Sequence, residues 1–128
     1  MENYAEKRKY PRVNVNCPIA LLLSNDEIVK ATIHDISTGG IQIRCDKNTA
    51  HKVQHEYECI KETTSTRFNV TFISPRKNRQ EKVKTACRLV YILRQDEDVY
   101  AIGMEFVDLE ENNRVRLEKL TENPADHI

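Results

Sequence analysis

Two short motifs near the start of this 128-residue chain combine side chains that suit recognition of a small charged molecule. Arg8 and Arg12 form an R-x-x-x-R pattern, and Asp35, Ser37 and Gly40 form the pattern D-x-S-x-x-G. The ten arginines of the chain would produce the first pattern about once by chance, whereas this composition would produce the second only about 0.005 times. Guanidinium groups make paired hydrogen bonds to phosphate, so the motifs are candidates for an anion-binding site.

The charge distribution limits the kind of anion. The 20 basic and 20 acidic residues cancel, and basic residues gather at 7–12 and 76–84, whereas the stretch from Gln95 onward holds ten acidic and three basic residues. Duplex nucleic acid requires neutralisation of phosphates over a broad face, which a chain of zero net charge is poorly built to supply. Local basic clusters can hold a small polyanion, although such clusters also occur in solvated loops.

No pattern in the sequence is typical of an enzyme. The chain has no G-x-S-x-G motif, no Walker loop and no G-x-G-x-x-G motif, and no histidine is placed to activate Ser37. We therefore expect no catalytic residues.

The histidines and cysteines give little support for a metal centre. His51, His55 and Cys59 would share one face of a helix, but ligands spread over two turns do not close readily around one ion. The four cysteines form no C-x-x-C pair, and free, buried thiols are expected. The sequence predicts neither a metal site nor a cofactor.

Apolar runs are short throughout the chain. The longest, such as Ile19–Leu23, have five residues, against about 20 for a membrane-spanning helix. Residues 1–6 lack the apolar core of a secretion signal. A cytoplasmic protein without a membrane span is expected.

Alternation of apolar and polar residues predicts six strands. The expected ranges are 13–23, 28–36, 41–45, 68–73, 83–94 and 99–107. Pro18, inside the first strand, is typical of an edge strand or a bulge, because proline has no amide hydrogen to donate. The fifth strand is expected to bury one face, formed by Val83, Cys87, Leu89, Tyr91 and Leu93.

The end of the chain changes to a helical pattern. Asp108 and Glu111 have the spacing of a capping box, and an apolar stripe follows, which predicts a helix at about 109–122. Six strands and one helix predict an all-β fold, a closed six-stranded antiparallel β-barrel with a C-terminal α-helix. The chain then divides into a flexible basic leader at 1–12, a barrel domain with its helix at 13–122, and a tail at 123–128.

The stretch from Asp46 to Ser65 is the hardest to interpret. Val53, Tyr57 and Ile60 fit a short helix, with a long loop as the alternative.

The two motifs, in this order and separated by 22 residues, resemble those of the PilZ family of cyclic di-GMP receptors. In that family R-x-x-x-R precedes the first strand, and [DN]-x-S-x-x-G ends the second. The segment Ile102–Phe106 is similar to the family's final strand, and Ala86–Ile92 to its penultimate strand. The resemblance covers roughly Arg8 to Leu120, and its clearest departure is the longer connection at 46–65.

The resemblance implies a split-barrel fold that binds cyclic di-GMP through Arg8, Arg12, Asp35, Ser37 and Gly40. Arginine can bind the phosphates or the O6 and N7 of guanine, and can stack on a base. The Asp35 carboxylate can accept from guanine N1–H and N2–H, and Ser37 adds a hydroxyl on the same face. Gly40 has no side chain, so ligand or backbone can approach closely.

Three further residues are weaker candidates. A basic residue directly before R-x-x-x-R goes, in the family, with binding of an intercalated pair of ligands, and Lys7 holds that position. Lys9 adds a second positive charge. Tyr91 lies where many relatives carry a tryptophan near the guanine, with an ordinary core tyrosine as the alternative.

The resemblance implies a receptor that binds cyclic di-GMP, orders its leader on the barrel and thereby signals to a separate effector protein. Motility, adhesion and exopolysaccharide production are the expected settings. One alternative is a PilZ-like adaptor that binds proteins and no nucleotide. A less favoured one is a small barrel that binds single-stranded nucleic acid, which would need exposed aromatic residues along a basic face.

Overall fold

Residues 12–61, 67–74 and 80–122 are described by the computed structural model. Apart from Arg12, the predicted leader lies outside the described residues, as does the tail at 123–128. The elements are β1 (Val13–Leu22), β2 (Ile28–Ile36), β3 (Gly40–Cys45), α1 (Lys47–Ile60), β4 (Arg67–Ile73), β5 (Lys82–Asp96), β6 (Val99–Val107) and α2 (Glu111–Glu122).

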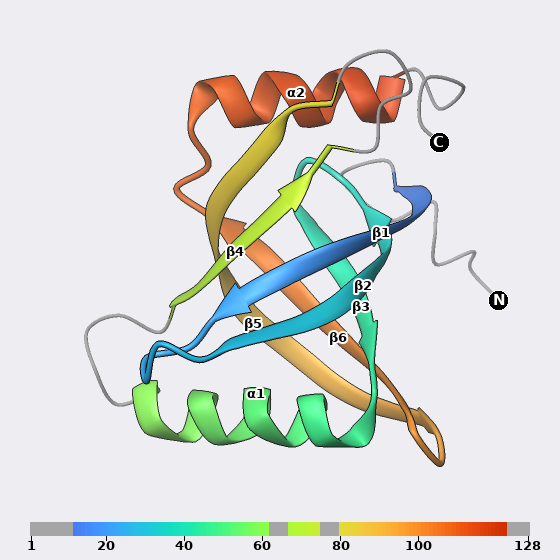
Figure 1. Cartoon of the computed structure of the whole chain (residues 1–128). Helices are drawn as coiled ribbons and strands as arrows, with labels where there is room; N and C mark the ends of the chain where they lie inside the picture. The colour runs from blue at the N-terminus through green and yellow to red at the C-terminus, as the bar shows by residue number, and fades with distance from the viewer. Residues whose placement is uncertain (1–11, 62–66, 75–79, 123–128) are drawn as a thin grey trace, which may run out of the picture.

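The six strands close into an antiparallel barrel in the order β1-β2-β3-β6-β5-β4 (Figure 1). Alternation produces this arrangement, because in β1 every second residue from Val13 to Leu21 is buried. The interior is filled mainly by branched aliphatic side chains, among them Ile19, Leu21, Ile33, Ile43, Val70 and Ile102. The predicted barrel with a C-terminal helix is confirmed, and β2 and β6 have the predicted bounds.

Pro18 lies where β1 changes its pairing. The strand pairs with β2 from Val13 onward, with a register shift between Asn14 and Cys17, but its pairing with β4 begins only at Ile19. Pro18 therefore stands at a local edge, next to an irregularity in the ladder, as the sequence predicted.

The stretch after Asp46 forms a helix, α1, and not a loop. The Asp46 carboxylate accepts a hydrogen bond from the Thr49 backbone N–H at 2.8 Å, and this bond lowers the pKa of Asp46 below its ordinary value. Ala50 and Val53 are fully buried, and α1 lies across one end of the barrel (Figure 1).

The second helix, α2, covers the opposite end of the barrel (Figure 1) and buries Leu117 and Leu120 completely. The predicted capping box is wrong. Asp108 lies three residues before the helix with a positive φ of 52°, and its carboxylate pairs with Arg67 at 2.7 Å. In the described residues, neither helix is long and apolar enough to cross a membrane.

The predicted buried face of β5 is wrong beyond Leu89. A register shift between Leu89 and Tyr91 inserts one extra residue opposite β6, so the two faces exchange from that point. Ile92 packs against the core, whereas Leu93 is 56% exposed. Tyr91 consequently lies on the outer face of the barrel.

Candidate functional site

The two sequence motifs meet at the point where β1 begins and β2 ends. Asn14 pairs with Asp35. This pairing brings Arg12, the residue before β1, to the end of β2. Arg12 Nη1 donates a hydrogen bond to Asp35 Oδ1 at 2.8 Å. The Asp35 side chain is only 12% exposed and that of Arg12 33%. This ion pair is therefore better shielded from water than a typical surface pair.

Ser37 shapes the turn that follows Asp35. Its Oγ accepts hydrogen bonds from the backbone N–H groups of Gly39, at 3.0 Å, and Gly40, at 3.2 Å. The Ser37 backbone N–H donates to the Gly40 carbonyl at 2.9 Å. The sequence predicted a hydroxyl on the same face as Asp35, but Ser37 is only 3% exposed and its oxygen accepts hydrogen bonds within the turn. Ser37 thus fixes the backbone that carries Asp35.

Gly40 is required by the approach of two strands. A Cβ added at Gly40 would lie 2.2 Å from the Met104 carbonyl oxygen on β6. The Phe106 backbone N–H also donates to the Gly39 carbonyl at 3.0 Å. The close approach predicted for Gly40 is thus made by the backbone of β6.

A row of residues on the outer face of the barrel runs from Asp35 on β2 across β3 and β6 to β5. Gln42 pairs with Asp35 on one side and with Gly103 on the other, and Gly103 pairs with Tyr91. The Tyr91 ring covers Gly103, because a Cβ added at Gly103 would lie 2.2 Å from Tyr91 Cε2. Gln42 Nε2 donates to the Tyr91 hydroxyl at 2.7 Å.

This row shows on which face of the barrel Tyr91 lies. Its side chain is on the outer face, in a residue that is 38% exposed, so it is not a core tyrosine. Sequence reasoning missed Gln42, although the signal was present: it stands two residues after Gly40 on an alternating strand and therefore faces outward.

Lys7, Arg8 and Lys9 lie outside the described residues, so the structure places only one arginine of the R-x-x-x-R motif. Among the remaining candidate residues, the structure brings the side chains of Arg12 and Asp35 into contact. Tyr91 joins Asp35 along the outer face through Gln42.

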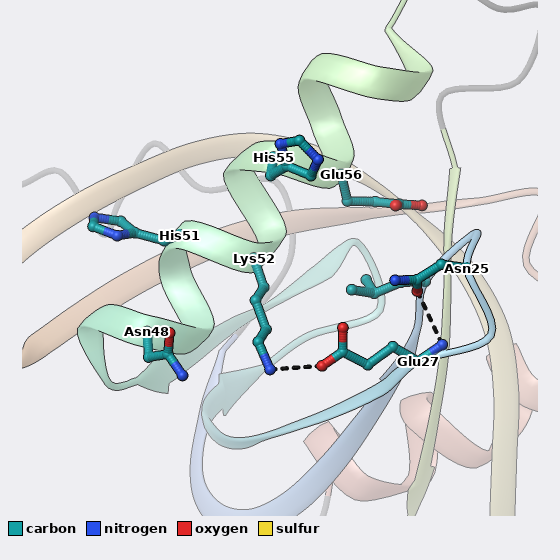
Figure 2. A pocket seen from close by; sticks show the side chains of 8 residues that line it. Asn25, Glu27, Asn48, His51, Lys52, His55 and Glu56 are labelled. Carbon is teal, nitrogen blue, oxygen red and sulfur yellow. Dashed lines mark hydrogen bonds and ion pairs between the residues drawn. The ribbon is translucent and has the colours of Figure 1, made fainter.

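A second polar feature lies at the opposite end of the barrel. A hollow of about 220 Å³ separates α1 from the β1–β2 turn, and the Lys52–Glu27 ion pair, at 2.6 Å, bridges its two walls (Figure 2). The buried Glu56 carboxylate accepts from the Ser24 backbone N–H at 2.9 Å and from its hydroxyl at 3.0 Å. These contacts fasten the turn to α1.

His51 and His55 also line this hollow, from successive turns of α1 (Figure 2). In the described part of the chain, no three histidine, cysteine, aspartate or glutamate side chains are arranged to hold a metal ion. The cysteines are free, and Cys17 and Cys87 are buried as predicted, but Cys59 is exposed on α1.

Residues 6–123 match the PilZ domain. The chain belongs to the PilZ family. No relative among the curated proteins matches it in sequence.

Solved structures share the fold of this PilZ domain at low sequence identity. The PilZ domain of YcgR from Escherichia coli, solved with c-di-GMP, is 13% identical with a TM-score of 0.64, over 93% of this chain and 94% of that one. The Bacillus subtilis inhibitor of motility MotI/DgrA is 12% identical with a TM-score of 0.71, over 93% and 51%. PlzA of Borreliella burgdorferi, solved in complex with c-di-GMP, is 13% identical with a TM-score of 0.60, over 95% and 54%. The chain thus spans about half the length of MotI/DgrA and PlzA.

Proposed function

We propose that this PilZ domain is a receptor for cyclic di-GMP and binds it on the outer face of the barrel, at the end of β2. The observation that carries the proposal is the Arg12–Asp35 ion pair, because it joins residues of two motifs that are 23 positions apart in sequence. Further support comes from the family membership and from solved relatives that contain c-di-GMP.

The proposed contacts follow from the chemistry of guanine. Its N1–H and N2–H groups can donate to the Asp35 carboxylate in place of Arg12. The released Arg12 guanidinium, together with Arg8, then binds phosphate or the O6 and N7 of guanine. Ser37 and Gly40 contribute by holding the turn, since their hydrogen bonds and close packing set the position of Asp35.

Lys7, Lys9 and Tyr91 complete the proposed site. Tyr91 offers an exposed aromatic ring on the same outer face as Asp35, where a guanine base can stack. Lys7 and Lys9 add positive charge beside Arg8, which favours an intercalated pair of ligands with four phosphates.

We further propose that the ligand changes the conformation of the segment before Arg12 and so alters a surface read by an effector protein. The domain then acts in the cytoplasm without catalysing a reaction, in motility, adhesion or exopolysaccharide production. A PilZ adaptor that binds no nucleotide is the second candidate.

Isothermal titration with cyclic di-GMP tests the receptor proposal. We expect binding at micromolar concentration, and about ten- to a hundred-fold weaker binding in Arg12→Ala, because one charge-assisted contact is lost. Arg114→Ala is the matched control, since Arg114 pairs with Glu111 on α2. No heat with the unaltered protein, or equal affinity in Arg12→Ala, would contradict the proposal and favour the adaptor.

A further inference from the structure

The outer face of β3 carries a second arginine close to the proposed site. Gln42 and Arg44 both face outward, because they alternate along the strand with Ile41 and Ile43, which are fully buried. Gln42 pairs with Asp35. Arg44 lies two residues farther along the strand, about 7 Å away at a rise of about 3.4 Å per residue.

Arg44 is held weakly in this position. Its Nη2 donates to Gln42 Oε1 at 3.3 Å, which is long for a charge-assisted hydrogen bond. Its Nε is buried and has no hydrogen-bond partner among the described residues. A buried N–H without an acceptor is unfavourable, so the side chain gains by moving to an acceptor that a ligand provides.

Five of the other described arginines differ from Arg44 in having carboxylate partners, whereas Arg94 donates to the Asp96 backbone carbonyl at 3.1 Å. The five paired arginines are Arg12, Arg67, Arg88, Arg114 and Arg116. Within the part of the chain that the structure describes, Arg44 makes no ion pair, so its charge remains available.

Gln42 connects this arginine to the rest of the outer face. Its amide nitrogen donates to the Tyr91 hydroxyl and its amide oxygen accepts from Arg44. One amide therefore orients both an aromatic ring and a guanidinium group, next to the strand position of Asp35.

We infer that Arg44 is a further ligand-binding residue of this domain and binds a phosphate of the cyclic dinucleotide, with Gln42 as its positioning residue. The inference rests on the proposed function, since it assigns a phosphate contact within that site. A guanidinium suits this role because its planar fork matches phosphate oxygens. The position of Arg44 extends the site along β3, which gives room for a ligand larger than one guanine.

Titration with cyclic di-GMP at several salt concentrations tests the inference on Arg44→Ala, with Arg114→Ala as the control of equal charge. We expect about tenfold weaker binding in Arg44→Ala, and a shallower dependence of affinity on salt, because one fewer phosphate is neutralised. Arg44→Lys keeps the charge but not the fork, and should restore the salt dependence and part of the affinity.

Two results would overturn the inference in different ways. If the unaltered protein binds and Arg44→Ala binds equally well with the same salt dependence, Arg44 is not a ligand residue and the receptor proposal stands. If the unaltered protein does not bind, both proposals fail. A thermal melt of each variant separates a lost contact from a lost fold, and Arg44→Gln provides a second neutral variant if Arg44→Ala unfolds.

Discussion

Arg12 donates to Asp35 at 2.8 Å, so the acidic residue of one motif is already paired with the last arginine of the other. A ligand that uses Asp35 must replace this pair, and a guanine edge offers the two N–H groups needed to do so. The exchange also releases the Arg12 guanidinium at the moment when a phosphate is present to receive it. Binding and movement of the chain at Arg12 are therefore coupled in this proposal.

Substitution of Asp35 should separate the role of its charge from that of its oxygen atoms. In Asp35→Ala we expect about ten- to a hundred-fold weaker binding of cyclic di-GMP, because both acceptors of the guanine edge are lost. Asp35→Asn keeps one acceptor oxygen and should bind between Asp35→Ala and the unaltered protein. Titration calorimetry measures all three, and equal affinity of Asp35→Ala and the unaltered protein would remove Asp35 from the site.

The contact between Tyr91 and Gly103 can be broken without altering either motif. In Gly103→Ala the new methyl group would lie 2.2 Å from the Tyr91 ring, so the exposed ring must move away and the bond to Gln42 is lost. We expect several-fold weaker binding of cyclic di-GMP, measured by titration, with a small loss of stability. Tyr91→Ala should reproduce the effect on binding.

Gly40→Ala is the informative comparison for Gly103→Ala. There the methyl group meets the Met104 backbone oxygen, which cannot move aside as a side chain can. We expect a loss of about 1–3 kcal/mol in the free energy of unfolding, as in overpacked cores. Equal stability of the two alanine variants in urea would contradict this account of Gly40.

The buried Glu56 carboxylate should stabilise the fold without affecting ligand binding. Glu56→Ala leaves the Ser24 N–H without its acceptor, and we expect a loss of about 1–3 kcal/mol in unfolding free energy. Glu58→Ala, which removes an exposed pair with Lys61, is the control and should have little effect. Urea denaturation measures both, and an altered affinity for cyclic di-GMP in Glu56→Ala would show that the ends of the barrel are coupled.

The four thiols should differ in reactivity. Burial raises the pKa of Cys17 to about 11 and that of Cys87 to about 12, so neither forms thiolate at neutral pH. Cys45 also has a pKa of about 11, raised first by burial and then by Asp46 and Asp98. An aromatic disulfide reagent at pH 8 should therefore modify the exposed Cys59 first, and Cys59→Ser should lack the fast phase. A fast phase that persists in Cys59→Ser would contradict this.

The same raised pKa values predict a loss of stability in alkali. The folded protein holds these thiol protons more tightly than the unfolded chain, whose thiols titrate near 9.0. Their contribution is therefore complete below pH 9.0 and declines as the pH rises toward 11 and 12. The urea midpoint measured from pH 8 to pH 11 should fall accordingly.

Periodicity alone predicted most of the barrel, because a strand with one buried face alternates residue by residue. It failed at β5, where one extra residue between Leu89 and Tyr91 reverses every later side chain, and no local sequence signal marks such a bulge. The capping-box prediction also failed at Asp108, because this residue adopts a left-handed conformation and pairs with Arg67.

The candidate site was also predicted only in part from the sequence. The meeting of Arg12 and Asp35 follows from the motifs, but the engagement of Ser37 by the turn depends on the turn conformation, which the sequence does not specify. Gln42 and Arg44 belong to neither motif. Only the pairing of β2, β3, β6 and β5 places Gln42 beside Asp35 and in one row with Tyr91, and Arg44 follows two residues later on β3.

The two helices close the two ends of the barrel (Figure 1). Val53 of α1 and Leu117 and Leu120 of α2 are fully buried there. Among the residues that the structure describes, the space between the two helices is filled by core side chains, most of them aliphatic. Under the proposed function, a bound ligand would contact the outer surface of the barrel, and its effect on a partner protein would have to pass along that same surface.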